Sequence, residues 1–184
     1  MDKQVNALIK RLEACPKGKA GWKAYEEVCG AILEFLFSPV IRRHKKTTTL
    51  TGVSRRDLIF ANRNLMPGNT LATANWNHLY GELAAKLVVF ECKNYHTDEI
   101  GATEVNQVRA YLSKPMGRLA VLICNKKPHE SAYKRRNTVY SNDQVVVLFA
   151  TNDELKEMLY MKLRNEEPSD LLLDLVDQFY IQHE

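Results

Sequence analysis

The chain has 184 residues, of which 45% are hydrophobic and 26% charged, and a formal net charge of +4 at pH 7. This composition fits one globular domain, residues 1–184, and excludes a membrane span, because no apolar run approaches the roughly 18 residues that a span needs. The N-terminus has no apolar signal block, so we expect a cytoplasmic protein without a membrane partner. The positive charge permits a nucleic-acid partner without requiring one.

The sequence carries no sign of a zinc site, a disulfide framework or a nucleotide-hydrolysing loop. The four cysteines lie far apart without C-x-x-C spacing, and two of them fall inside apolar runs, so we expect reduced core residues. The five histidines show no metal-ligand spacing. There is also no G-x-x-x-x-G-K-[ST] motif for phosphate binding.

Two helices are predicted at the start of the chain. Apolar residues at helical spacing indicate a short helix within residues 1–14, inside an N-terminal segment that we place at residues 1–20. A stronger amphipathic helix runs from Trp22 to Leu36, with Trp22 and Tyr25 on its apolar side and Gly30 outside it. Glu26 and Glu27 both fall on its polar flank, so which of the two faces a site stays open.

Two basic segments are candidates for phosphate contacts. A strand expected to start at residues 40–41 runs into a basic stretch, and another basic stretch within residues 128–142 is expected to be a helix or loop. The alternative, a solvated surface, stays open for both. The candidate residues for nucleic-acid binding are Arg42, Arg43, Lys45, Lys46, Arg55, Lys134, Arg135 and Arg136.

The rest of the chain alternates strands and helices, which indicates an α/β protein. Uniformly apolar runs at residues 119–124 and 145–149 predict strands covered on both faces. Helices are expected at residues 103–112, from the capping box at Thr151 to Arg164, and within a C-terminal segment, residues 165–184. Residues 62–86 show no clear period, although Trp76, Leu79, Tyr80 and Leu83 could form a short helix near their end.

The candidate chemistry lies in the apolar stretch of residues 87–95, which contains Glu91 and Lys93. Residues i and i+2 of a strand point to the same face, so these two side chains should project together. Buried charges need a partner or a metal. Two explanations stay open: an edge-strand ion pair, or a site shared with Asp57, which precedes the apolar residues 58–60 as either a turn residue or a ligand.

If the strands of Asp57 and Glu91 are neighbours, their carboxylates can converge beside Lys93. Two carboxylates, completed by a main-chain carbonyl and waters, are ligands that Mg²⁺ or Mn²⁺ accepts. Such an ion would neutralise the carboxylates and lower the pKa of a bound water to make a nucleophile. Lys93 would orient that water or stabilise the transition state.

This combination resembles the PD-(D/E)XK nuclease superfamily, whose hallmark is an Asp on one strand and Glu-x-Lys on the next. The resemblance extends over about residues 22–163. Tyr25-Glu26 is similar to the aromatic-Glu pair of Mrr-like restriction enzymes, in which the acid helps to bind metal. Gln107 and Tyr111 resemble the Q-x-x-x-Y element of RecB-like nucleases, although they could also form an ordinary helix face. Arg56, instead of proline, precedes Asp57.

The resemblance implies a restriction-endonuclease-like fold in three layers, with a central mixed sheet of four to five strands flanked by helices. It implies a metal-dependent endonuclease that hydrolyses DNA, expected to be double-stranded, in bacterial restriction or antiphage defence. The implied catalytic residues are Asp57, Glu91, Lys93 and Gln107, and the implied metal site consists of Asp57, Glu91, Cys92 and Glu26, for Mg²⁺ or Mn²⁺.

Further expectations concern partners and alternatives. The protein could be a homodimer, or a module of a larger defence effector or its partner. Residues 62–86 form a connection longer than a simple hairpin, which could be a lid, a DNA-binding element or a dimer contact. One alternative is a non-catalytic DNA-binding or assembly module on the same fold. Another is an unrelated α/β enzyme, which a large separation of Asp57 and Glu91 would favour.

Overall fold

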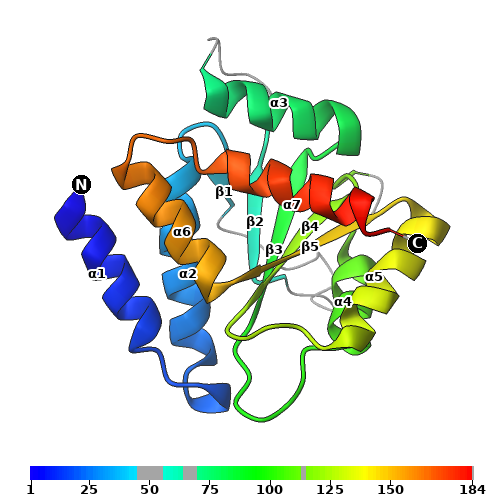
Figure 1. Cartoon of the computed structure of the whole chain (residues 1–184), viewed down its shortest axis with the longest axis horizontal. Coiled ribbons are helices and arrows are strands. Elements are labelled where there is room, and N and C mark those ends of the chain that lie inside the picture. Colours follow the sequence, from blue (N-terminus) through cyan, green and yellow to red (C-terminus); the bar gives the residue numbers. More distant parts are fainter. Residues whose placement is uncertain (45–55, 64–69, 113–114, 184) are drawn as a thin grey trace.

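A computed structural model of the chain describes residues 1–44, 56–63, 70–112 and 115–183. Lys45, Lys46 and Arg55 lie outside these residues. The described residues form an α/β protein in which seven α-helices pack around a mixed sheet of five strands (Figure 1). No helix among them is long and apolar enough to cross a membrane.

The chain begins with two helices, as the apolar spacing predicts. These are α1 (Asp2–Glu13) and α2 (Trp22–Phe37), joined through a short 3-10 helix, Gly18–Ala20. Two assignments on α2 were wrong. Trp22 is 49% exposed, because the first residue of the helix lies beyond the part that covers the core. Gly30 is buried under the guanidinium of Arg43, which an added Cβ would approach to 2.6 Å.

The five strands are hydrogen-bonded in chain order, from β1 to β5 (Figure 1). The first three pair antiparallel and the last three pair parallel. The first strand starts later than residues 40–41 predict, because the N–H of Ile41 still bonds to the carbonyl of Phe37 in the preceding helix. The strands are β1 (Arg42–Arg43), β2 (Leu58–Ala61), β3 (Leu87–Lys93), β4 (Leu119–Cys124) and β5 (Val146–Thr151).

The connection from β2 to β3 contains a full helix, α3 (Leu71–Leu83), longer than the short one predicted. The side chain of Thr70 caps its first turn. Trp76, Leu79 and Leu83 are buried, and the Trp76 ring meets Phe37 edge-on at 5.2 Å between centroids. This helix therefore belongs to the core of the domain.

The remaining helices follow the parallel strands. The basic segment forms a helix, and the predicted capping box is confirmed by the bonds between Thr151 and Glu154. The helices are α4 (Ala102–Tyr111), α5 (Glu130–Asp143), α6 (Asn152–Leu163) and α7 (Ser169–Ile181).

The sheet separates two hydrophobic cores, so helices cover both of its faces. Val88 and Phe90 of β3 point into the larger core, which also contains apolar residues of α1, α2, α3, α6 and α7. Val89 points the other way, into the core under α4 and α5. Because side chains alternate along a strand, Glu91 and Lys93 share the face of Val89 and project toward α4.

Gly117 holds together the two segments that lead into β3 and β4. It has a φ of +99°, and an added Cβ would lie 2.0 Å from the carbonyl oxygen of Ala84. Beside it, the N–H of Arg118 bonds to the carbonyl of Leu83, and the N–H of Leu87 to that of Met116. These bonds help to set the register of the strand that carries Glu91.

We expect Gly117→Ala to lower the free energy of unfolding by at least about 2 kcal/mol, because the backbone would be strained and the Cβ would clash. Gly81→Ala is the matched control, since nothing lies within 4 Å of its Cβ position and it is in α3. The better helix propensity of alanine should stabilise that variant by about 0.5–1 kcal/mol. Urea unfolding measures both, and equal stabilities would contradict the assigned role of Gly117.

Candidate active site

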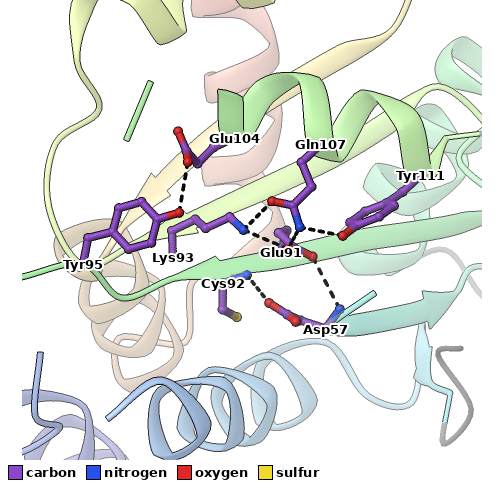
Figure 2. A network of polar contacts seen from close by, with 8 residues as sticks. All are labelled: Asp57, Glu91, Cys92, Lys93, Tyr95, Glu104, Gln107 and Tyr111. Carbon is purple, nitrogen blue, oxygen red and sulfur yellow. Dashed lines mark hydrogen bonds and ion pairs between the residues drawn. The ribbon is translucent and has the colours of Figure 1, made fainter. Parts of the chain in front are cut away.

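Asp57, directly before β2, lies beside Glu91 of β3, and the expectation that the two strands are neighbours is confirmed by the pairing of β2 with β3. The register pairs Leu58 with Phe90, so the next position of the ladder sets Asp57 opposite Glu91. The N–H of Asp57 is 3.5 Å from Oε2 of Glu91. The N–H of Cys92 donates to Oδ2 of Asp57 at 2.9 Å (Figure 2). Two carboxylates are thus held at one end of the antiparallel pair.

Glu91, Lys93 and Gln107 form a closed triangle of hydrogen bonds on the α4 face of the sheet. The ammonium of Lys93 donates to Oε1 of Glu91 at 3.0 Å and to Oε1 of Gln107 at 2.8 Å. Nε2 of Gln107 donates to Oε1 of Glu91 at 3.1 Å (Figure 2). Glu91 is 2% and Lys93 8% exposed. The explanation as an edge-strand ion pair is therefore wrong, since β3 is a central strand, and the site shared with Asp57 stays a prediction.

Tyr111 extends the triangle along α4. Its hydroxyl accepts a bond from Nε2 of Gln107 at 2.6 Å, so the two residues of the Q-x-x-x-Y spacing are joined. Arg56 lies 5.6 Å over the Tyr111 ring and donates to its carbonyl oxygen at 3.2 Å. Arg56 thus connects the segment that carries Asp57 to α4, the helix that carries Gln107. In the sequence, the only signal for this role was the position of Arg56 next to Asp57.

Sequence reasoning also missed the polar residues that follow β3. The N–H of Asn125 donates to the carbonyl of Lys93 at 3.0 Å, and its amide bonds to Asn94 and to the carbonyl of Tyr95. The hydroxyl of Tyr95 donates to Glu104 of α4 at 3.0 Å (Figure 2). These bonds fix the end of the strand and the start of α4. The asparagines directly after two neighbouring strands were the available signal.

The two carboxylates give the site an excess of negative charge. Burial first, and then the charge of Asp57, raise the pKa of Glu91 to about 7, although Lys93 acts to lower it. The pKa of the Cys92 thiol is also raised, by a hydrogen bond with Cys29 and by burial. A neutral thiol is a poor ligand for a hard cation, so Cys92 can serve such an ion through its main-chain carbonyl.

The donors suit a hard divalent cation better than a zinc ion. The carboxylates of Asp57 and Glu91 and the main-chain carbonyl of Cys92 would leave coordination positions for the waters that Mg²⁺ retains. A cation would also offset the charge of Asp57 that raises the pKa of Glu91. Among the described residues, no three His, Cys, Asp or Glu side chains gather closely enough to hold a metal ion. Glu26 is 8% exposed and Glu27 is exposed, so Glu26 is the one that faces inward.

The described candidates for nucleic-acid binding are not equivalent. Arg42 is exposed, and Arg43 lies 3.8 Å from Glu34. Lys134 forms an exposed pair with Glu130, and Arg135 donates to Asn106 at 2.6 Å. Arg136, however, is only 7% exposed, because its guanidinium packs among aromatic rings. The surface cluster of α5 is therefore smaller than the sequence suggests.

The raised pKa of Glu91 predicts a pH-dependent stability in the absence of divalent ions. An acid with a raised pKa contributes stability below its unfolded pKa, about 4.5, and loses it as pH rises through about 7. Glu91→Gln removes this titration while keeping an acceptor for Lys93. Relative to the parent, its free energy of unfolding should rise by about 3 kcal/mol between about pH 4.5 and about pH 8.

Urea unfolding in EDTA at stepped pH measures this difference. Glu27→Gln, at an exposed position of α2, is the control for a lost glutamate charge. A difference between Glu91→Gln and the parent that stays flat across this range would contradict the raised pKa.

The chain is similar to part of a longer protein. A protein of Escherichia coli (strain K12) named "Putative transposon gamma-delta 80.3 kDa protein" is 24% identical over 176 residues, covering 93% of this chain and 24% of that protein. The chain thus spans about a quarter of the length of this relative. No family model and no solved structure matches the chain.

Proposed function

We propose that the protein is a metal-dependent endonuclease that hydrolyses phosphodiester bonds in DNA. The observation that carries the proposal is the meeting of Asp57, Glu91, Lys93 and Gln107 in one hydrogen-bonded site. The residues of the PD-(D/E)XK resemblance lie apart in the sequence, and a mixed sheet flanked by helices supports a restriction-endonuclease-like fold. A coincidental Glu-x-Lys on an unrelated enzyme would leave Asp57 elsewhere.

Asp57, Glu91 and the main-chain carbonyl of Cys92 would hold Mg²⁺ or Mn²⁺. Glu26, the further ligand that the resemblance implies, is buried on α2 but does not gather with these carboxylates into a metal-holding group within the described residues. When bound, the ion would neutralise the carboxylates, lower the pKa of a water and stabilise charge on a phosphate oxygen. Cys92 also contributes its N–H, which orients the carboxylate of Asp57 at 2.9 Å.

Lys93 would act on the attacking water or on the charge that develops at the phosphate. Its ammonium is buried, so its interaction with a developing anion is stronger than it would be in water. Gln107 holds that ammonium in place, and Tyr111 in turn orients the Gln107 amide. The chain thus supplies a preorganised cation whose direction is set by α4.

Phosphate contacts away from the site would supply most of the affinity for double-stranded DNA. Arg42, Arg43, Lys134 and Arg135 are the described candidates, with Lys45, Lys46 and Arg55 in the part of the chain that is not described. Such contacts carry no base information, so target choice would come from elsewhere. Homodimerisation is one route to it.

The likeness to a fraction of a longer protein supports a module that works within, or beside, a larger assembly. The relative's name refers to a transposon, and an activity on DNA agrees with that name. We place the module in bacterial restriction or antiphage defence, where the PD-(D/E)XK members that it resembles are used.

A non-catalytic DNA-binding module on the same fold is the second candidate. It is favoured by one observation: within the described residues, Asp57 and Glu91 are not joined by a third His, Cys, Asp or Glu side chain. On this alternative, the pair of Glu91 and Lys93 is structural, and metal ions neither bind at the site nor switch on cleavage.

Metal binding separates the two candidates. We expect Mn²⁺ to raise the midpoint of thermal unfolding of the parent by several degrees, because an ion bound to the folded state stabilises it. Asp57→Asn should abolish this rise, whereas Asp174→Asn, on an exposed position of α7, should keep it. Calorimetric scans with Mn²⁺ or EDTA measure the shift. An equal rise in Asp57→Asn would remove the metal site.

Cleavage itself tests Lys93. With Mg²⁺ or Mn²⁺ the parent should cut double-stranded DNA, and EDTA should abolish cutting. Lys93→Met should reduce the rate by roughly a hundredfold or more, a typical loss for one group that stabilises a transition state, while DNA affinity stays near that of the parent. Lys86→Met, at an exposed position before β3, is the control. Cutting by Lys93→Met at the parental rate would exclude the role of Lys93 in cleavage. A parallel assay with RNA of the same sequence tests whether the enzyme prefers DNA to RNA.

A further inference from the structure

A concave site lies beside β5, apart from the carboxylates of Asp57 and Glu91. It is a cavity of about 790 Å³, within the usual range for small-molecule sites. Its walls come from α5, the first turn of α6, α7 and the loop after β4. None of the residues assigned to metal binding or cleavage lines it.

Arg136 lines this cavity and is more than nine-tenths buried. Its guanidinium carbon lies 4.9, 5.2 and 5.1 Å from the ring centroids of Tyr133, Phe149 and Phe179. Its one hydrogen bond among the described residues runs from Nη2 to Oε1 of Gln182, at 3.4 Å. Within the part of the chain that the structure describes, no carboxylate pairs with it and its Nε has no acceptor.

A buried guanidinium without a carboxylate is costly, so this arrangement calls for an anion. Burial lowers the pKa of Arg136, as expected where no acid compensates its charge. The guanidinium carbon lies over three aromatic rings, and one hydrogen bond among the described residues, to Gln182, uses its N–H donors. The terminal nitrogens therefore remain suited to a fork of bonds with an oxyanion.

The rest of the lining adds positive charge. Lys17, Lys126, Lys127 and Lys156 line the cavity with Arg136, against two carboxylates. Asp153 pairs with Lys156 at 2.9 Å, and the same ammonium lies 3.8 Å from Glu13, so the positive charge of the lining rests mainly on Arg136 and the other three lysines. Glu154 accepts the N–H of Thr151 at 2.7 Å. The N-terminus of α6, the positive end of a helix of 12 residues, points to the same place.

We propose that this cavity binds a phosphomonoester dianion, with the guanidinium of Arg136 as its anchor. The surplus of several cations favours a dianion over a carboxylate, and planar Arg donors match phosphate oxygens. A mononucleotide or the 5′-phosphorylated end of a DNA strand carries such a group. The inference goes beyond the proposed nuclease, because it needs neither metal nor Lys93.

The test is calorimetric titration of the full chain in EDTA with inorganic phosphate, dAMP, deoxyadenosine, and one short single-stranded DNA with either a 5′-phosphate or a 5′-hydroxyl. We expect dAMP to bind saturably and deoxyadenosine at least about tenfold more weakly, the usual effect of losing a charged hydrogen-bonded pair. A preference of the DNA for its 5′-phosphate form identifies a strand end as the source, and no such preference identifies the free nucleotide.

Arg136→Gln should lower the affinity for dAMP about tenfold or more. Because Arg136 is buried, a second variant, Lys17→Ala with Lys127→Ala, removes two exposed lining cations without touching the core. This double variant should also lower the affinity for dAMP several-fold. Lys19→Ala with Lys23→Ala, exposed and absent from the lining, is the control of equal charge.

Three results would overturn the proposal: no saturable binding of dAMP, equal binding of dAMP and deoxyadenosine, or a cavity double variant that binds as the control does. Lys93→Met should bind dAMP like the parent. A failure of this inference and a failure of the proposed nuclease can therefore be told apart.

Discussion

The buried ion pair of Glu91 and Lys93 is the constraint on which the site depends. A central strand, covered on both faces, cannot carry two charges unless neighbouring groups satisfy them. The triangle with Gln107 does this on the α4 side, and Asp57 meets the same carboxylate from the adjacent strand. The partners compensate unequally, however, since two carboxylates face one ammonium. The raised pKa of Glu91 expresses that imbalance, which a divalent cation would relieve.

Much of this arrangement was predictable from the sequence, because it follows from periodicity. The uniformly apolar runs form β4 and β5, and the strand context of Asp57 and Glu91 led to their being placed on neighbouring strands. Alternation along β3 then determined that Glu91 and Lys93 share a face. The long connection before β3 was harder, since α3 is partly amphipathic but polar at its centre. Its helix is recognisable mainly from Trp76, Leu79 and Leu83, which pack into the core.

The remaining differences come from contacts that no local pattern contains. Glu26 shares a helical stripe with Gly30 and Leu33, at spacings of four and seven residues, and this stripe is buried: Leu33 belongs to the larger core, and Arg43 packs against Gly30. The face of α2 that carries Gly30 and Glu26 is therefore directed inward, although the sequence pattern placed both residues outside the apolar side. Arg136 is a similar case: its sequence neighbours are basic, but the rings that bury it come from α5, β5 and α7. The burial of Glu26 and of Arg136 therefore depends on tertiary packing, which cannot be predicted from the periodicity of the sequence.

The negative surplus at Asp57 and Glu91 and the positive surplus around Arg136 both lie at the carboxyl ends of the parallel strands. Glu91 and Lys93 end β3, and the cavity of Arg136 is lined by residues that directly follow β4 and β5. Ligands of sheets with parallel strands bind outside the carboxyl ends of those strands, where loops and helix N-termini meet. Asn125 connects the two places, because it bonds to the carbonyl of Lys93 and also lines the cavity. A surplus of negative charge at one place suits a cation, and a surplus of positive charge at the other suits a phosphate. If both proposals hold, the carboxyl ends of the parallel strands would bind a cation at one place and a phosphate at the other.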